Sequence, residues 1–190
     1  MADRLSFLCF VTDQMRGDHM GCAGNRVIQT PNLDRLAATG VRFTRAYCNN
    51  PLCMPSRATL FTGLTPRGHG VRTNGIRLDP RHPTMPQALV EAGYRTHSVG
   101  KIHLQPFQTP KGLDPGMLVP EEWAESYHFW NVGRLKAVPT PYYGLQTVEI
   151  SIGHGAGVTG DYRRWLRAQD PSAEALWRPE AGRPTPHKAE

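Results

Sequence analysis

The feature that most limits the folds open to this chain is the alternation of strand-like and helix-like segments along its N-terminal half. An apolar run at residues 5–11 has the composition of a buried strand. Thr30 and Pro31 are typical of a helix start, and Gly40 is typical of the end of that helix. Residues 41–47 alternate in part between apolar and polar side chains, which favours a second strand.

The alternation repeats over the next stretch of the chain. Residues 55–61 are interpreted as a helix with Gly63 as its stop. The capping-box pattern at 84–87 begins another helix, which runs to Glu91 with Gly93 as its stop. Residues 94–99 then return as a strand. Strands that alternate with helices predict an α/β fold with a largely parallel central sheet flanked by helices.

The C-terminal half is less regular. Residues 105–143 are interrupted by proline and glycine and are interpreted as a long irregular excursion over the sheet. A strand near 145–150 and a helix across 161–167 are expected to follow. The sequence therefore predicts one globular part over 1–170, and a polar tail over 171–190 whose composition is typical of disorder.

Charge and cysteine content exclude some classes of function. The chain has 190 residues with 22 basic and 16 acidic side chains, but no block of like charges typical of a nucleic-acid-binding tail. We therefore expect no nucleic-acid partner, whereas a net charge of +6 would suit an enzyme for anionic esters. The four cysteines form no CxxC pair, so neither a zinc knuckle nor a disulfide framework is predicted.

No segment has the pattern of a targeting or membrane-spanning sequence. The apolar run at 5–11 is interrupted by Ser6 and is too short for a signal peptide, whose apolar region is about 7–15 residues long and precedes a cleavage site. No run approaches the ~18 apolar residues that span a bilayer. We therefore expect a cytoplasmic protein without membrane contact.

The segment 51–63 carries the sharpest chemical pattern. Cys53 lies just before a predicted helix whose first turn contains Pro55, Ser56 and Arg57. Unpaired amides at a helix N-terminus attract anions, and the guanidinium of Arg57 adds a fixed cation. A nucleophile at position 53 and an anionic substrate would then share one electropositive corner. The alternative is an ordinary buried cysteine beside a surface arginine.

This segment resembles the signature of type I sulfatases, hydrolases of the alkaline phosphatase superfamily in which a Cys-x-Pro-x-Arg core directs oxidation of the cysteine to formylglycine. Cys53, Pro55 and Arg57 match that core, and the Leu-x-Thr-Gly ending follows at 60–63. Met54 stands where a small residue is more usual. The resemblance implies an alkaline-phosphatase-like layered fold, of which this chain would be a truncated, N-terminal part.

Two further segments resemble the family in the order that the family has them. Asp13 and Gln14 are similar to its metal-binding acidic pair, in an Asp-Gln form found in choline-sulfatase-like and phosphonate monoester hydrolase-like branches. Oxygen ligands of this kind suit calcium, or alternatively magnesium. Lys101 and His103 match the Gly-Lys-x-His end of the second signature. The match implies that Lys101 holds a sulfate oxygen and that His103 donates a hydrogen bond or carries a proton.

The resemblance implies a sulfuric ester hydrolase whose nucleophile derives from Cys53, with a formylglycine-generating enzyme as the maturation partner. The aldehyde hydrates, and one hydroxyl, activated by a divalent metal, attacks sulfur and releases the alcohol or phenol. The second hydroxyl then expels sulfate as the aldehyde re-forms. The metal would be held by Asp13, Gln14 and the modified Cys53. Arg57 and Lys101 would stabilise the developing charge.

The chain is shorter than the resemblance requires. Sulfatases take further metal ligands and a second lysine from downstream, and residues 104–190 contain no convincing Asp-Asn or Asp-His pair. Three interpretations remain open: a sulfate ester hydrolase, a phosphonate monoester or phosphodiester hydrolase of the same superfamily, and a non-catalytic fragment or anion-binding module. Gln14 favours the second, but Lys101 and His103 argue against it, because those branches tend to replace this pair.

Other candidate residues carry less specific patterns. His69 has no assignable catalytic role and is interpreted as shaping a loop, and His97 is interpreted as a structural residue of a strand. His154 lies between two glycines, and the sequence leaves it open between substrate contact and loop. Tyr162, Trp165 and Leu166 are expected on the buried face of a helix.

Overall fold

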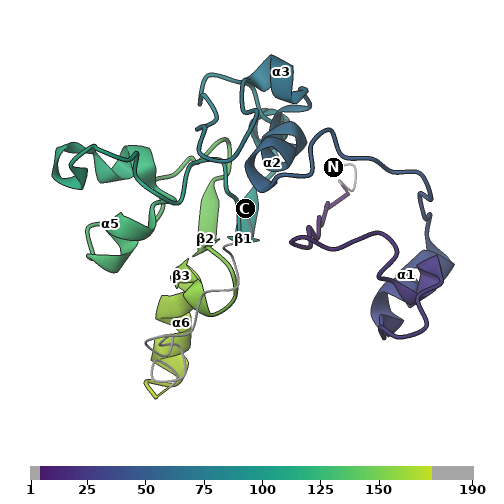
Figure 1. Ribbon diagram of the computed structural model, residues 1–190. Helices are drawn as coiled ribbons and strands as arrows, with labels where there is room; N and C mark the ends of the chain where they lie inside the picture. The colour runs from purple at the N-terminus through teal and green to yellow at the C-terminus, as the bar shows by residue number, and fades with distance from the viewer. Residues whose placement is uncertain (1–4, 173–190) are drawn as a thin grey trace. The chain divides into compact units, whose positions relative to one another are not determined.

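The computed structural model describes residues 5–172, and the chain divides into two compact units, Met1–Tyr47 and Cys48–Glu190 (Figure 1). From position 173 onward the predicted tail lies outside the described residues. The single globular part expected over 1–170 stays a prediction. Among residues 5–172, no helix is both long enough and apolar enough to cross a membrane.

Over its described residues, 5–47, the first unit contains the 3₁₀ turn η1 (Gly21–Ala23) and the short helix α1 (Pro31–Thr39). Thr30 precedes α1 as predicted, but its hydroxyl does not cap the helix. Instead, Thr30 Oγ1 accepts a hydrogen bond from the Gly21 amide at 2.8 Å and donates one to Asp34 Oδ1 at 3.0 Å. The Cys22 amide donates to the same carboxylate oxygen at 2.7 Å. The predicted helix start therefore also anchors the preceding turn.

Two strands predicted in this unit are not strands in the structure. Residues 5–11 and 41–47 contain no strand, and the side chains of Phe10 and Phe43 are 83% and 79% exposed. A strand exists only when its backbone hydrogen-bonds to a neighbouring strand. An apolar run shows a tendency to be buried, but it carries no information about which neighbour supplies the hydrogen bonds. The predicted strands are absent because, among the described residues, these segments have no neighbouring strand that supplies the hydrogen bonds.

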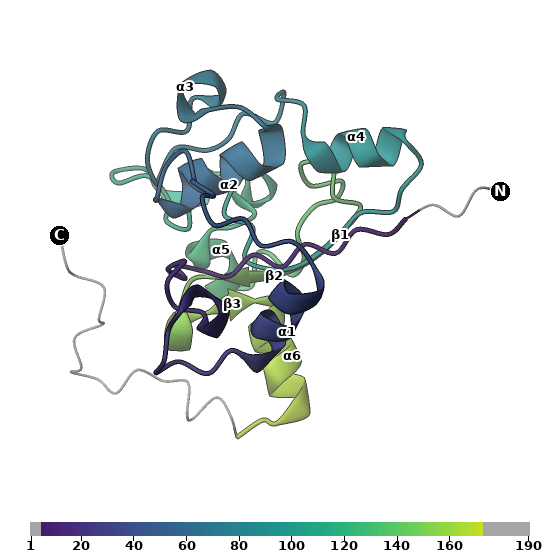
Figure 2. The ribbon, with the colours of Figure 1, turned by 90° about the vertical axis from the view of Figure 1, so that its right-hand side faces the viewer.

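The second unit combines helices with a mixed sheet, as an α/β fold requires (Figure 1, Figure 2). Its α-helices are α2 (Cys53–Thr62), α3 (Pro66–His69), α4 (Met85–Glu91), α5 (Tyr127–Asn131) and α6 (Asp161–Gln169). Its 3₁₀ turns are η2 (Pro115–Met117), η3 (Pro120–Trp123) and η4 (Gly155–Gly157). Its strands are β1 (His97–Gly100), β2 (Thr147–Ile152) and β3 (Thr159–Gly160).

The sheet of the second unit has the strand order β1-β2-β3. β1 runs parallel to β2, with His97 opposite Thr147, and β2 runs antiparallel to β3, with Ile152 opposite Thr159. The parallel pair extends over more residues than the antiparallel pair. Parallel strands present their carboxyl ends at a common edge, and residues that follow the two strands therefore gather there.

The capping residues predicted from the sequence set the ends of two helices. α2 begins at Cys53, earlier than predicted, and ends at Gly63, whose φ of 70° is a left-handed conformation that glycine adopts at low cost. Thr84 caps α4, with its Oγ1 accepting a hydrogen bond from the Gln87 amide at 3.3 Å. Because α2 begins at Cys53, this residue belongs to the first helical turn and not to the preceding loop.

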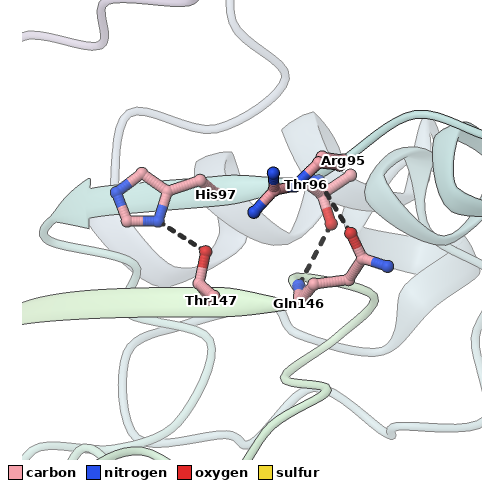
Figure 3. A pocket seen from close by; sticks show the side chains of 5 residues that line it. All are labelled: Arg95, Thr96, His97, Gln146 and Thr147. Atoms are coloured by element: carbon pink, nitrogen blue, oxygen red, sulfur yellow. Dashed lines mark hydrogen bonds between the residues drawn. The ribbon is translucent and has the colours of Figure 1, made fainter.

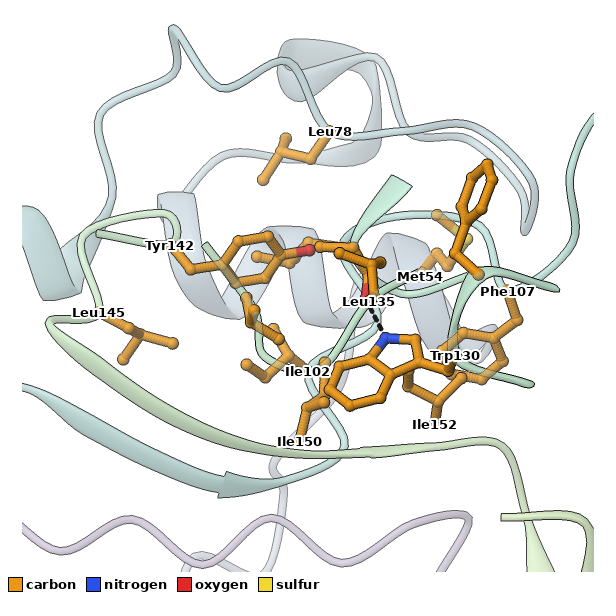
Figure 4. Packing of buried hydrophobic residues seen from close by; sticks show 14 of the residues in the cluster. Met54, Leu78, Ile102, Phe107, Trp130, Leu135, Tyr142, Leu145, Ile150 and Ile152 are labelled. Carbon is orange, nitrogen blue, oxygen red and sulfur yellow. Dashed lines mark hydrogen bonds between the residues drawn. The ribbon is translucent and has the colours of Figure 1, made fainter. Parts of the chain in front are cut away.

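The core of the second unit is formed by α2, the sheet and the irregular excursion (Figure 4). Met54 and Ala58 of α2 are fully buried, as are Ile150 and Ile152 of β2. Phe129, from α5 within the excursion, is also fully buried. Burial of one large apolar side chain stabilises a fold by about 1.5–3 kcal/mol. The excursion is therefore part of the core and fixes α2 against the sheet.

α6 does not bury the aromatic face predicted for it. Tyr162 and Trp165 are 40% and 57% exposed, and their stacked rings have centroids 5.9 Å apart. The helix is held at its first residue, where Asp161 Oδ2 accepts a hydrogen bond from the Ile150 amide at 2.8 Å and Oδ1 accepts one from Arg164. The polar start of α6, and not its aromatic side chains, fixes it to β2.

Candidate active site

Cys53 lies at the start of α2 with its side chain half-buried. The turn before it is shaped by Asn50, whose Oδ1 accepts a hydrogen bond from the Leu52 amide at 2.8 Å. The Met54 amide donates to Asn74 Oδ1 at 2.9 Å. Helix starts leave backbone amides without partners inside the helix. Two asparagine side chains satisfy amides here, and they fix the position of the thiol at the helix N-terminus.

Lys101 and His154 meet beside this thiol. The Lys101 Nζ atom lies 3.5 Å from Cys53 Sγ and 2.5 Å from His154 Nε2. Lys101 directly follows β1, and His154 follows β2. Because the two strands are parallel, their carboxyl ends bring these residues to one edge of the sheet. A neutral imidazole can accept a hydrogen bond from the ammonium group, so His154 orients Lys101.

Arg57 acts on the backbone of Lys101. Its side chain is 9% exposed, and its Nη1 atom donates to the Lys101 carbonyl oxygen at 2.5 Å. A hydrogen bond from a charged donor is roughly twice as strong as one between neutral groups. The sequence predicted both residues as cations of one site, and the structure brings them together. It also shows that the arginine holds the segment that carries the lysine.

His103 is buried and stacks on Phe107. The two ring centroids are 3.6 Å apart, with an interplanar angle of 11°. Lys101 Nζ lies 5.7 Å from the centroid of the same phenyl ring, within the range of a cation–π contact. His103 also has a left-handed backbone with φ 58°, which is uncommon for a residue with a side chain. Phe107 is therefore a common support for the two predicted site residues.

Glu125 is a residue of this region that sequence reasoning missed. Its fully buried carboxylate accepts hydrogen bonds from the amides of His103, Leu104 and Gln105 and from the Tyr142 hydroxyl. Burial raises the pKa of this carboxyl, and the hydrogen bonds from Tyr142 and the three amides act in the opposite direction. No sequence signal marks this glutamate, because it follows two exposed glutamates in an irregular segment.

His69 has the structural role predicted for it. Its Nδ1 accepts a hydrogen bond from the Val71 amide at 3.1 Å, and its Nε2 lies 3.1 Å from Thr59 Oγ1 on α2. The ring proton of the neutral form is therefore on Nε2. Burial, and secondly the charge of His82, lower the pKa of His69. Its neutral form thus ties α3 to α2.

Replacing His69 with glutamine is expected to reduce the acid sensitivity of the fold. The pKa of His69 is lower in the folded chain than its ordinary value of 6.5, so the unfolded chain binds the proton first. Stability is therefore lost as the pH falls below about 6.5, with a slope of at most about 1.4 kcal/mol per pH unit. Urea unfolding on both sides of this pH measures the slope. The exposed His128→Gln is the control, and an unchanged slope in His69→Gln would contradict the prediction.

Asp13 and Gln14 belong to the first unit. Both are exposed, and Gln14 has a left-handed backbone with φ 47°, so the chain turns immediately after Asp13. A carboxylate and an amide oxygen at adjacent positions are donors that fit a hard cation such as calcium. Their role as metal ligands stays a prediction.

Two cavities of the second unit are lined by residues other than the predicted catalytic ones. One, of about 530 Å³, is lined by Arg95, Thr96, His97, Gln146 and Thr147 (Figure 3). The Thr96 amide donates to Gln146 Oε1 at 3.2 Å, and His97 Nδ1 lies 2.7 Å from Thr147 Oγ1. The other, of about 570 Å³, lies between residues 80–90 and 140–146. The first cavity lies at the amino ends of β1 and β2, opposite the edge that carries Lys101.

Comparisons with known proteins place this arrangement in a family. The chain matches the family model named Sulfatase over residues 6–131. It is 35% identical over 135 residues to N-acetylglucosamine-6-O-sulfatase of Bacteroides thetaiotaomicron, with 69% of this chain and 24% of the relative covered. It is 38% identical over 115 residues to an arylsulfatase of Clostridium perfringens, with 60% and 24% covered.

A solved structure agrees with the sequence comparisons. Phosphonate monoester hydrolase of Agrobacterium radiobacter superposes on the chain with a TM-score of 0.59 at 30% identity. The superposition covers 86% of this chain and 28% of that one. The small mixed sheet and its helices thus form part of an alkaline-phosphatase-like α/β fold, which confirms the predicted fold class.

The family match extends over the segments that carry Cys53, Arg57, Lys101 and His103. The chain belongs to the sulfatase family. It spans about a quarter of the length of the curated relatives it matches, 24% in each of the two named above. This partial coverage fits the predicted resemblance to the N-terminal portion of the family's fold.

Proposed function

We propose that this chain forms the nucleophile-bearing part of a sulfuric ester hydrolase. The observation that carries the proposal is the 3.5 Å contact between Lys101 Nζ and Cys53 Sγ at the N-terminus of α2. A cation beside the nucleophile position, at a helix end that attracts anions, can bind an anionic ester close to the attacking atom. The family and its two named sulfatases support a sulfate ester as the substrate.

Each residue around Cys53 has a separate role in this proposal. Oxidised to formylglycine, Cys53 would supply the hydroxyl of a hydrated aldehyde as the nucleophile. Lys101 binds a sulfate oxygen, and its ammonium group is oriented by contacts with His154 and with the Phe107 ring. Arg57 holds the Lys101 carbonyl oxygen and so keeps the base of the lysine side chain in place.

His103 and a divalent cation complete the proposed site. Because it is buried against Phe107, His103 has the fixed orientation that a hydrogen-bond donor or proton carrier needs. Asp13 and Gln14 would hold calcium, with magnesium as the alternative, together with the modified Cys53. Bound there, the cation would supply Lewis-acid stabilisation of negative charge.

The proposal also defines the partners. The Cys-x-Pro-x-Arg core at 53–57 is the segment on which a formylglycine-generating enzyme would act. The substrate would be a small sulfate ester, and neither nucleic acid nor a membrane is a proposed partner. We propose a cytoplasmic location, as the sequence led us to expect.

A phosphonate monoester or phosphodiester hydrolase is the second candidate function. Two observations favour it, namely the superposition on a phosphonate monoester hydrolase at a TM-score of 0.59 and the presence of Gln14 beside Asp13. Lys101 and His103 favour a sulfate ester, because the Gly-Lys-x-His pattern is the one that sulfatases carry. Activity toward the two ester types distinguishes the candidates.

Turnover of a chromogenic aryl sulfate by this 190-residue chain tests the proposal. The chain is co-expressed with a formylglycine-generating enzyme, and mass spectrometry confirms oxidation of Cys53 before the assay. We expect sulfate release that a chelator stops and that calcium restores, because the cation neutralises charge on the ester. An oxidised chain that releases no sulfate with calcium present shows that these residues do not suffice for turnover, which contradicts hydrolysis by this chain alone. Faster hydrolysis of an aryl phosphodiester would support the second candidate.

A further inference from the structure

We propose that Glu125 is a positioning residue for the site around Cys53, because its buried carboxylate holds the backbone of 103–105 in the conformation that places His103. The effect of Glu125 on catalysis rests on the proposed function, whereas the hydrogen bonds that it accepts do not. Glu125 lies between η3 and α5, outside both sulfatase-like signatures, and is fully buried.

The carboxylate of Glu125 accepts four hydrogen bonds. Oε2 accepts from the His103 amide at 2.5 Å, and Oε1 accepts from the amides of Leu104 and Gln105 at 2.7 and 3.1 Å. The Tyr142 hydroxyl donates to Oε1 at 2.8 Å. A buried carboxylate is costly unless hydrogen bonds compensate its charge. Three of the four donors belong to consecutive residues, so most of this compensation comes from one short segment.

The backbone of His103 explains how three consecutive amides reach one carboxylate. Amides of neighbouring residues converge on an anion when the chain curls through a left-handed residue, an arrangement known as a nest. His103 is that residue, with φ 58°. A left-handed conformation is unfavourable for a residue with a side chain and persists only where its surroundings hold it. The carboxylate of Glu125 supplies the compensating hydrogen bonds.

The segment held by Glu125 is continuous with the proposed site. At one end, Arg57 donates to the Lys101 carbonyl oxygen at 2.5 Å. At the other end, the Phe107 carbonyl oxygen accepts a hydrogen bond from the Tyr127 amide at 2.8 Å. The Phe107 ring supports His103 by stacking and contacts the Lys101 ammonium. A change in the middle of this segment is therefore expected to displace His103 relative to Phe107.

The four donors require an acceptor with two oxygens. Glutamine has the same size but only one oxygen, and its NH₂ group has no lone pair for an amide donor. If its oxygen takes the position of Oε1, the His103 amide faces the NH₂ group and loses its partner. Glu125→Gln therefore removes the hydrogen bond to the left-handed residue while filling the same space.

Amide and imidazole NMR of the 190-residue chain tests the proposal. We expect the stacking on Phe107 to shift the His103 ring protons upfield in the unmodified chain. In Glu125→Gln we expect loss of this shift and loss of hydrogen-exchange protection at the His103 amide, with the remaining resonances retained. Glu122→Gln removes the same charge from an exposed neighbour and should leave the signals unchanged.

Tyr142→Phe separates positioning from general support of the core. It removes one donor from the carboxylate but leaves the three amide bonds, so the His103 signals should persist. Equal loss of these signals in Tyr142→Phe and Glu125→Gln, or their retention in both, overturns the proposal. If Glu125→Gln does not fold, exchange in the unmodified chain decides. Slow exchange at 103–105 supports the proposal, and exchange as fast as in exposed loops overturns it.

Kinetics connect this positioning to the proposed reaction. Displacement of a site residue by about 1 Å can lower the rate by about 10²-fold. We expect a loss of that size in kcat for Glu125→Gln, with KM unchanged, because the substrate-binding charge of Lys101 remains. If the unmodified chain shows no turnover, the proposed hydrolase function fails for this chain, and the NMR result still decides the role of Glu125.

Discussion

Replacement of Cys53 with alanine is expected to abolish sulfate ester hydrolysis. Removal of a catalytic nucleophile can lower kcat by about 10⁶-fold, which would place the variant below detection here. The Cys53 thiol lies beside Lys101, and its oxidation to formylglycine would produce the nucleophile. Alanine has the highest helix propensity and fits the first turn of α2, so the variant should fold. Initial rates with an aryl sulfate, beside thermal unfolding of the same samples, measure both effects.

Cys48 provides the matched control for this experiment. It is an exposed cysteine of the same unit, and it lies outside the Cys-x-Pro-x-Arg core. Cys48→Ala should therefore retain the activity of the unmodified chain. Turnover that persists in Cys53→Ala would show that another group is the nucleophile, and the proposed mechanism would have to be abandoned.

The parts of the fold that depend on local chemistry could be predicted from the sequence. Gly63 ends α2 because glycine tolerates the left-handed conformation, and Thr84 caps α4 through its hydroxyl. Both effects act within a single turn of the chain. Residues 5–11 failed as a strand because a strand depends on a partner that composition does not specify. Trp165 failed as a buried residue for the same reason, since helical spacing does not show what lies opposite.

The residues of the candidate site also divide into those that the sequence predicted and those that it did not. The spacing within a short motif predicted Arg57 next to Cys53, and the second motif predicted Lys101. His154 could have been found from the sequence only by assuming that its strand runs parallel to the one before Lys101. Glu125 could not have been found, because three of its four partners are backbone amides and every residue except proline has one. A short motif marked Arg57, which also holds backbone, whereas Glu125 holds backbone from outside any motif.

Replacement of Lys101 with alanine is expected to lower kcat/KM by about 10²–10³-fold, the usual effect of removing one preorganised group that stabilises charge in a transition state. The ammonium lies 3.5 Å from Cys53 Sγ, beside the nucleophile position. Lys111, an exposed lysine of the irregular excursion, gives the matched control, and Lys111→Ala should retain full activity. If the Lys101→Ala variant were as active as that control, Lys101 would have no role in catalysis.

Combining Lys101→Ala with His154→Ala then tests whether the histidine acts through the lysine. The Lys101 Nζ and His154 Nε2 atoms are 2.5 Å apart, and residues in contact show coupling energies of about 0.5–3 kcal/mol in double-mutant cycles. If His154 only orients the ammonium, His154→Ala alone should lower the rate of hydrolysis. The same substitution should cause little further loss of rate in a chain that already carries Lys101→Ala. Independent effects that multiply would instead show that His154 contacts the substrate itself. Because His154 is exposed and lies at the carboxyl end of β2, the same cycle decides whether this edge of the sheet carries one cationic group or two separate substrate contacts.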